Sequence, residues 1–215
     1  MANSKFPGKP VIQVAEVLDE NLVDRNPIEL FQRWFSDAIA AGLPLPEAMT
    51  LATSTAEGKP SARVVLLKQI DENGFVFFTN YQSSKAHDLD NNPQAALVFY
   101  WPQLERQVRV EGKVTRTSPV ESDKYFRTRP RESQIGAIAS PQSEVLSSRE
   151  VLQKRAEELE RIYDGREIER PAHWGGYRLT PDRIEFWKGR IGRLHDRILY
   201  EHQRDGSWTI SRLAP

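Results

Sequence analysis

Short runs of β-branched and aromatic residues, separated by turn sequences, follow one another along this chain of 215 residues. The clearest turn is Asp71-Glu72-Asn73-Gly74, which joins the apolar runs at 61–68 and 75–79. Turns of this kind connect neighbouring antiparallel strands. Further strands are predicted at 50–54, 95–101, 107–117, 174–179, 183–187, 195–201 and 208–213. Because these strands succeed one another mostly as hairpins, the sequence predicts a mainly β protein, an antiparallel barrel with peripheral helices.

Helices are predicted where start signals precede apolar residues at helical spacing. Asn26 is placed to cap a helix, Pro27 suits its first position, Glu29 completes a capping box and Gly42 ends it. Further helices are predicted at 83–91, 119–128 and 148–163, and the proline-punctuated segment 129–143 is predicted to be a loop. Weak periodicity predicts that residues 1–25 form a mobile arm ahead of a single domain over 26–215.

Composition excludes several classes of function. Thirty Lys and Arg residues balance thirty Asp and Glu residues, so neither nucleic acid nor an anionic membrane is an expected partner. The absence of cysteine excludes disulfides, Cys-zinc sites and thiol catalysis. The four histidines lack metal-ligand spacing, so no metal is expected. Without a long apolar run or a secretory segment near the N-terminus, we expect a cytoplasmic protein.

Three basic residues stand at alternate positions near the C-terminus. On a strand, Arg193, His195 and Arg197 would share one face. Two guanidinium groups flanking an imidazole repel one another unless an anion lies between them. With the apolar run Ile184 to Trp187 just upstream, this pattern indicates a concave site for a flat anionic ligand. The alternative is a solvated cationic face of an ordinary barrel strand.

Two further patterns could bind phosphate. The segment Thr79 to Lys85 places hydroxyl groups and a lysine at a helix N-terminus, which favours an anion, although an ordinary serine cap has the same appearance. Arg63 and Lys68 bracket four apolar residues and would face opposite sides of a regular strand. They would then serve different partners unless a bulge intervenes, or they simply mark the ends of the strand.

A third pattern has a spacing of four residues. Tyr125, Arg129 and Ser133 would lie on one face of a continuous helix and could clamp a phosphate. Pro130 interrupts that helix, and an exposed helix end is the alternative interpretation.

Several long motifs resemble one known family. They are "RVVLLK" at 63–68, "FFTNYQSSKAHDLDNNP" at 77–93, "ERQVRVEG" at 105–112, "YFRTRPRESQIGAIASPQS" at 125–143 and "HWGGYRLTPDRIEFWKGRIGRLHDRILY" at 173–200, with "RLAP" at the end. Over 26–215 the chain resembles the pyridoxine/pyridoxamine 5′-phosphate oxidase family. The resemblance implies a split β-barrel that binds FMN at a homodimer interface. It also implies oxidation of pyridoxine 5′-phosphate and pyridoxamine 5′-phosphate to pyridoxal 5′-phosphate, with O2 reduced to H2O2.

The resemblance also assigns residues to ligands. The implied FMN-binding residues are Arg63, Val64, Val65, Leu66, Leu67, Lys68, Phe78, Thr79, Ser84, Lys85, Gln107, Gln142, Ser143, Trp187 and Arg197. The implied substrate-binding residues are Lys68, Tyr125, Arg129, Ser133, Arg193 and His195. Of these, Arg193 and His195 are the implied catalytic pair over the reacting ring. His195 could hydrogen-bond the substrate or assist proton removal, and a neutral structural role is the alternative.

Two other functions stay open at this point. A related FMN oxidase could act on a non-phosphorylated aromatic such as a phenazine precursor, although such a substrate has no use for the phosphate clamp. A flavin-binding protein without turnover would have no use for Arg193 and His195. The chain departs from the family at Ser84, commonly Arg, at Phe78, often Tyr, and at Leu45, where an acidic residue is frequent.

Overall fold

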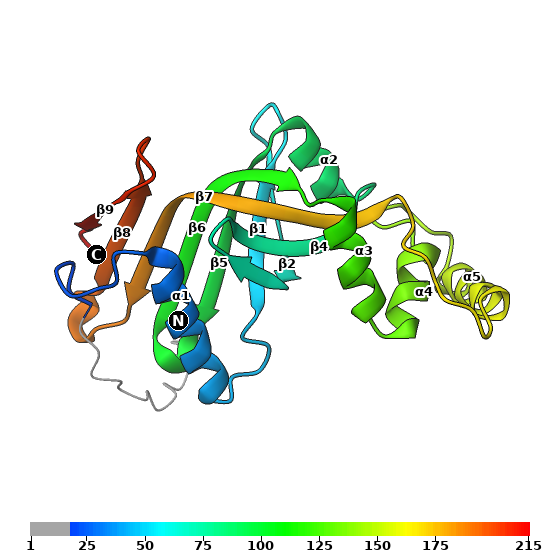
Figure 1. Cartoon of the computed structure of the whole chain (residues 1–215), viewed down its shortest axis with the longest axis horizontal. Helices are drawn as coiled ribbons and strands as arrows, with labels where there is room; N and C mark the ends of the chain where they lie inside the picture. The colour runs from blue at the N-terminus through cyan, green and yellow to red at the C-terminus, as the bar shows by residue number, and fades with distance from the viewer. Residues whose placement is uncertain (1–17) are drawn as a thin grey trace, which may run out of the picture. The chain divides into compact units, whose positions relative to one another are not determined.

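A computed structural model describes residues 18–215, which divide into two compact units. Unit 1 comprises 18–47, 98–110 and 183–215, and unit 2 comprises 48–97 and 111–182. Three strands, β5 (Gln94–Trp101), β6 (Arg106–Arg116) and β7 (Trp174–Lys188), contribute residues to both units. Strand pairing follows the order β2-β1-β5-β6-β7-β4-β3, and a further hairpin extends from β7. The predicted antiparallel, mainly β fold with peripheral helices is confirmed (Figure 1).

Unit 2 is built from hairpins and four helices. Its complete strands are β1 (Ala48–Ser54), β2 (Pro60–Leu66), β3 (Gln69–Asp71) and β4 (Gly74–Asn80). Its helices are α2 (Ser84–Asn91), α3 (Pro119–Thr128), α4 (Arg131–Ala139) and α5 (Arg149–Ile162). Gly74 permits the predicted β3–β4 turn because its φ of 121° lies in the region that only glycine adopts readily.

The helices of unit 2 are where the sequence prediction was partly wrong. Residues 131–139, predicted as loop, form α4, which begins directly after Pro130. The proline therefore separates two helices: α3 ends at Thr128, and Arg129 lies in extended backbone between them. The structure also shows one strand, β7, where two were predicted at 174–179 and 183–187. Helix α3 begins with a capping box between Ser118 and Glu121 that the prediction did not include.

Unit 1 contains α1 (Pro27–Ala40) and the hairpin of β8 (Asp196–His202) and β9 (Trp208–Arg212). Two short 3-10 helices, η1 (Pro102–Leu104) and η2 (Ile191–Arg193), complete it. The Asn26 side chain accepts a hydrogen bond from the main-chain N–H of Ile28, so the predicted helix start is confirmed. Aromatic side chains form the core of this unit; for example, Trp34 packs edge-to-face on Phe186 with ring centroids 5.3 Å apart.

The predicted N-terminal arm falls mainly on residues 1–17, which lie outside the described residues. Its last part belongs to unit 1, where Leu18 is buried. The Arg212 guanidinium donates to the main-chain oxygen of Leu18 at 2.6 Å, and the Tyr200 hydroxyl donates to that of Asp24 at 2.8 Å. The division into an arm over 1–25 and a single domain over 26–215 stays a prediction.

Candidate functional site

A pocket of about 370 Å³ opens in unit 2, a volume within the range of small-molecule sites. It brings together side chains from β2, β4, β7, α2 and α3, and from the segments that follow β2, α3 and α4. The lining residues are Arg63, Val64, Val65, Leu66, Lys68, Phe78, Thr79, Lys85, Tyr125, Arg129, Gln142 and Trp174. All except Trp174 had been predicted as site residues from the sequence.

Lys85 forms one end of this pocket. Its Nζ donates to Gln142 Oε1 at 2.8 Å, Thr79 Oγ1 at 3.1 Å and Ser83 Oγ at 3.2 Å, all of them uncharged oxygens. Burial lowers the pKa of Lys85 to about 8, and the nearby charge of Arg63 adds to this effect. A half-buried ammonium group without a carboxylate partner among residues 18–215 can stabilise a bound anion.

Arg63 is fixed beside Lys85 by strand β1. Its Nη1 donates to Thr53 Oγ1 at 2.7 Å, and Thr53 in turn donates to Asp88 Oδ2 at 2.6 Å. The Asp88 carboxylate lies 4.0 Å from Arg63 Nη2, at the limit of an ion pair. The guanidinium is therefore oriented mainly by neutral oxygens, and much of its charge stays available to a ligand.

Three of the residues that line the pocket are aromatic and form its aromatic wall. Phe78 stacks on Tyr125 with ring centroids 4.0 Å apart and on Trp174 at 5.4 Å. The Arg129 guanidinium carbon lies 4.6 Å from the Trp174 ring centroid. Burial lowers the pKa of Arg129 and raises that of Tyr125. Arg129 Nη1 is buried and has no hydrogen-bond partner within residues 18–215, which marks a place for an acceptor.

Lys68 lines the same pocket as Arg63, contrary to the expectation that they face opposite sides. The regular alternation of side chains ends with β2 at Leu66, two residues before Lys68. The chain then turns, and the Lys68 main-chain N–H donates to Val76 O on β4 at 2.8 Å. The expectation was wrong because it assumed that one strand continued to Lys68.

Four predicted site residues of unit 2 do not line the pocket. Leu67 is buried in the core, and Ser133 lies on α4 rather than on the helix of Tyr125. Ser84 and Ser143 meet each other instead, since the Ser84 main-chain N–H donates to Ser143 Oγ at 3.2 Å. This contact places Ser143 at the N-terminus of α2, where Lys85, the residue after Ser84, donates from its Nζ to Thr79 Oγ1 on β4.

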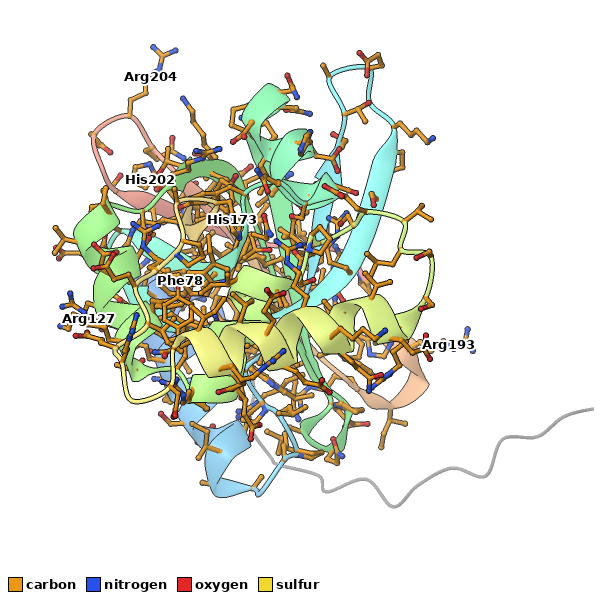
Figure 2. The ribbon with its side chains drawn as sticks, turned by 90° about the vertical axis from the view of Figure 1, so that its right-hand side faces the viewer. Phe78, Arg127, His173, Arg193, His202 and Arg204 are labelled. Atoms are coloured by element: carbon orange, nitrogen blue, oxygen red, sulfur yellow. The ribbon has the colours of Figure 1, made fainter. Side chains whose placement is uncertain are left out.

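The other predicted residues belong to unit 1. The alternating strand face predicted for Arg193, His195 and Arg197 is wrong, because β8 begins only at Asp196. Arg193 ends η2 with a φ of 61°, and its side chain is exposed and extends outwards (Figure 2). The His195 ring lies beside Trp187 with centroids 4.6 Å apart. Gln107 is half-buried on β6.

Arg197 already has an anionic partner within unit 1. Its Nε donates to Glu185 Oε1 at 2.7 Å and its Nη2 to Glu185 Oε2 at 3.1 Å. A third contact runs from Nη1 to the main-chain oxygen of Ala214 at 2.8 Å. The charge of Arg197 is thus balanced by a buried carboxylate, and the sequence argument that an outside anion must separate the cations does not hold for it.

Two family models match this chain. Residues 35–163 match the model described as pyridoxamine 5′-phosphate oxidase, and residues 174–215 match the pyridoxine 5′-phosphate oxidase C-terminal dimerisation region. A pyridoxine/pyridoxamine 5′-phosphate oxidase from Trichormus variabilis is 58% identical over 200 residues, which cover 93% of this chain and 94% of that protein. One from Paraburkholderia phymatum is 59% identical over 198 residues, covering 92% and 93%. The chain belongs to the pyridoxine/pyridoxamine 5′-phosphate oxidase family.

Solved structures agree with this assignment. PhzG of Burkholderia lata, solved in complex with tetrahydrophenazine-1-carboxylic acid, is 33% identical to this chain. The match covers 93% of this chain and 98% of that one, with a TM-score of 0.88. An FMN-binding protein from Nostoc punctiforme related to pyridoxamine 5′-phosphate oxidase shares the fold at 17% identity and a TM-score of 0.69. The fold is the split barrel of this oxidase family.

The sequence did not identify three residues that position or neutralise the arginine side chains described above. Trp174 supports Arg129, Glu185 pairs with Arg197, and Asp88 holds Thr53 beside Arg63. Glu185 carried a usable signal, because an acidic residue inside the apolar run Ile184 to Trp187 is buried only when it has a partner. Trp174 and Asp88 carried none, since their roles depend on which segments the fold brings together.

Proposed function

We propose that this protein oxidises pyridoxine 5′-phosphate and pyridoxamine 5′-phosphate to pyridoxal 5′-phosphate, with FMN as cofactor and O2 as final acceptor. The high identity to oxidases of that name over nearly the full chain supports the activity. The observation that carries the choice of a phosphorylated substrate is Arg129, whose buried Nη1 lacks a partner among the described residues. A phosphate oxygen would satisfy that donor.

FMN fits the part of the unit 2 pocket that Lys85 and Arg63 line. Lys85 and Arg63 offer two cations whose hydrogen bonds within the described residues go to neutral oxygens, and a dianionic phosphate would balance both. Thr79, Gln142 and the N-terminus of α2 would add uncharged donors there. Trp187, Gln107 and Arg197 of unit 1 are proposed as further flavin contacts, and Leu67, Ser84 and Ser143 as contacts or supports of the phosphate.

The substrate phosphate is assigned to Lys68, Tyr125, Arg129 and Ser133. Lys68 and Arg129 supply charge, and the Tyr125 hydroxyl supplies a donor held in place by stacking on Phe78. Arg193 and His195 are proposed to contact the reacting end of the substrate. Bound FMN would supply the redox chemistry, a two-electron oxidation of the substrate carbon with O2 as the final acceptor reduced to H2O2. The alcohol loses two hydrogens to become the aldehyde; the amine also takes up water and releases ammonia.

The chain's own residues would bind and orient. Two separately anchored phosphates, one on FMN and one on the substrate, would fix the distance between the reacting carbon and the flavin. The apolar lining from Val64, Val65 and Leu66 would keep water from the flavin face. A homodimer is proposed as the working form, supported by the match of residues 174–215 to a dimerisation region.

An aerobic assay tests this function. Purified protein reconstituted with FMN should convert pyridoxine 5′-phosphate to the aldehyde and produce one H2O2 for each aldehyde. Unphosphorylated pyridoxine should be a poor substrate, and sedimentation should show a dimer. Turnover of a tetrahydrophenazine carboxylic acid in preference to pyridoxine 5′-phosphate would instead support the rival function. Protein that binds FMN but oxidises neither compound would be a flavin-binding protein without turnover.

A further inference from the structure

The loop that connects β7 to β8 folds back on itself around His195. The main-chain N–H of Arg190, two residues beyond the end of β7, donates to His195 Nδ1 at 3.0 Å. Between them the chain passes through Gly192 and Arg193, both at positive φ, 71° and 61°. The loop is therefore a tight reversal that presents one particular main-chain donor to one particular ring nitrogen.

Ion pairs fix this reversal from the side. Asp196 Oδ2 accepts from Arg190 Nε at 2.6 Å, and its Oδ1 accepts from Arg212 Nη1 on β9 at 2.9 Å. The two arginines hold the pKa of Asp196 below its ordinary value, so the carboxylate is charged at neutral pH. Trp187 lies against the ring of His195, with centroids 4.6 Å apart. The ring thus has a neighbour on one side and a fixed hydrogen bond at Nδ1.

The hydrogen bond decides which ring nitrogen carries the proton. A main-chain N–H can only donate, so Nδ1 must accept with its lone pair. A neutral imidazole has one N–H and one acceptor nitrogen, and with Nδ1 as acceptor the proton lies on Nε2. An Nδ1–H group would instead put two donors face to face and break the contact with Arg190.

We infer that His195 acts as a hydrogen-bond donor through Nε2–H, and that Arg190 and Asp196 are positioning residues that fix this tautomer. The inference deepens the proposed function and rests on it for the identity of the acceptor, a polar atom of the substrate. The inference decides between hydrogen bonding to the substrate and proton removal as the role of His195. A ring whose Nε2 already carries a proton cannot take the substrate's proton at that atom, so His195 orients the substrate rather than serving as its base.

The tautomer can be measured without any turnover. In the FMN-loaded protein labelled with 15N-histidine, the His195 signals should show a protonated Nε2 and an unprotonated, hydrogen-bonded Nδ1. The chain has four histidines, and His195→Gln identifies the resonances of interest by their loss. A protonated Nδ1, or two protonated nitrogens at neutral pH, would overturn the inference whatever the substrate of the enzyme proves to be.

Kinetics then distinguish donor from base. The amide nitrogen of glutamine can replace the Nε2–H donor but is no base, whereas leucine offers neither. His195→Gln should keep kcat for pyridoxine 5′-phosphate within about tenfold, and His195→Leu should lose distinctly more. A base role predicts that both variants lose an equal factor of about 10²–10⁴. Equal, large losses would therefore contradict the donor assignment, as would leucine performing as well as glutamine.

The positioning residues have their own matched variants. Arg190→Gln and Asp196→Asn should each remove the ion pair, lower kcat about tenfold and replace the single His195 tautomer by averaged 15N signals. Arg190→Lys keeps a charge that can reach Asp196 and should restore both readouts. Arg204→Gln is the control, because Arg204 extends into solvent from the β8–β9 turn (Figure 2). Unchanged His195 signals in both Arg190→Gln and Asp196→Asn would show that these residues do not fix the ring.

Discussion

The guanidinium carbon of Arg129 lies 4.6 Å from the ring centroid of Trp174, and its Nη1 is buried without a hydrogen-bond partner among residues 18–215. Stacking on the Trp174 ring holds the Arg129 guanidinium in place, because the face of an aromatic ring attracts a cation. The N–H donors of the guanidinium stay available for hydrogen bonds to a ligand. Pro130 contributes by ending the helix, which leaves Arg129 in extended backbone rather than within a helical turn. Arg129 is therefore positioned to bind an anion through its buried Nη1.

Replacing Arg129 should therefore affect the phosphorylated substrate selectively. Arg129→Met should weaken binding of pyridoxine 5′-phosphate by about 1.5–3 kcal/mol, the usual value of a lost charge-assisted hydrogen bond. The weak activity on unphosphorylated pyridoxine should change little. Steady-state kinetics with both compounds measures this. Arg127→Met is the control, since Arg127 lies two residues earlier, in the last turn of α3, with 70% of its side chain exposed. If both variants lose activity toward both compounds equally, the phosphate is not bound by Arg129.

Lys85 should make FMN binding dependent on pH. Because burial lowers its pKa to about 8 in the protein without ligand, Lys85 is mostly charged at pH 7 and mostly neutral at pH 9.5. The FMN phosphate is a dianion throughout this range. The dissociation constant of FMN, measured by titrating the apo protein and following flavin fluorescence, should therefore rise as pH increases through about 8.

Two variants test the assignment of that pH dependence. Lys85→Arg keeps its charge up to much higher pH, so its FMN affinity should vary less between pH 7 and 9.5. Lys85→Met should bind FMN weakly and equally at both values. A pH dependence that persists unchanged in Lys85→Met would assign it to another group.

The sequence predicted the strands and most of the pocket because both depend on local patterns. Turn residues such as Asn73-Gly74 mark hairpins, and Asn26-Pro27 mark a helix start, whatever the rest of the chain does. The motifs at 63–68 and 77–93 carry functional side chains in a fixed order, so a family resemblance locates them directly. Strands β2 and β4, which these motifs occupy, both contribute side chains to the lining of the pocket.

Long-range contacts explain what the sequence could not supply. Nothing around Arg197 shows that Glu185, twelve residues away, neutralises it across the β7–β8 pair. The alternation of Arg193, His195 and Arg197 is typical of a strand, yet Gly192 at positive φ allows a 3-10 turn and delays β8 until Asp196. Lys68 likewise reaches the pocket because of a turn after Leu66, and periodicity alone cannot locate such a turn.

Gly176 should be required for the aromatic wall of the pocket. A Cβ at this position would lie 2.5 Å from Thr117 Oγ1 and 2.8 Å from Phe78 Cε1, closer than real contacts allow. Gly176→Ala should therefore displace Phe78 from its stack on Tyr125, cost about 1–3 kcal/mol of unfolding free energy and raise KM for the phosphorylated substrate. Urea unfolding and kinetics measure the two effects.

Gly136 on α4 is the matched control for this substitution. A Cβ there meets no atom within 4 Å, and alanine favours a helix by about 1 kcal/mol over glycine. Gly136→Ala should raise the unfolding free energy and leave KM unchanged. If Gly176→Ala is as stable and active as Gly136→Ala, the close approach of Gly176 to Phe78 does not support the site.

Replacing Arg193 and replacing Arg197 should have different effects on stability and on FMN binding, although the two residues are only four positions apart. Arg193 is exposed, and its positive φ is unfavourable for arginine and alanine alike. Arg193→Ala should therefore leave the unfolding free energy and the FMN affinity near those of the parent. It should lower kcat. Arg197→Ala leaves the buried Glu185 with Arg109, at 3.3 Å, as its remaining ion-pair partner among residues 18–215. It should therefore cost about 1–3 kcal/mol of unfolding free energy and weaken FMN retention. Glu185→Gln is the companion variant. It should reproduce the loss of stability with a smaller effect on FMN affinity, because Arg197 keeps its charge.

Urea unfolding of the apo proteins and FMN titration of each variant measure these effects. A stable Arg197→Ala that retains FMN, beside an Arg193→Ala that loses it, would reverse the two assignments.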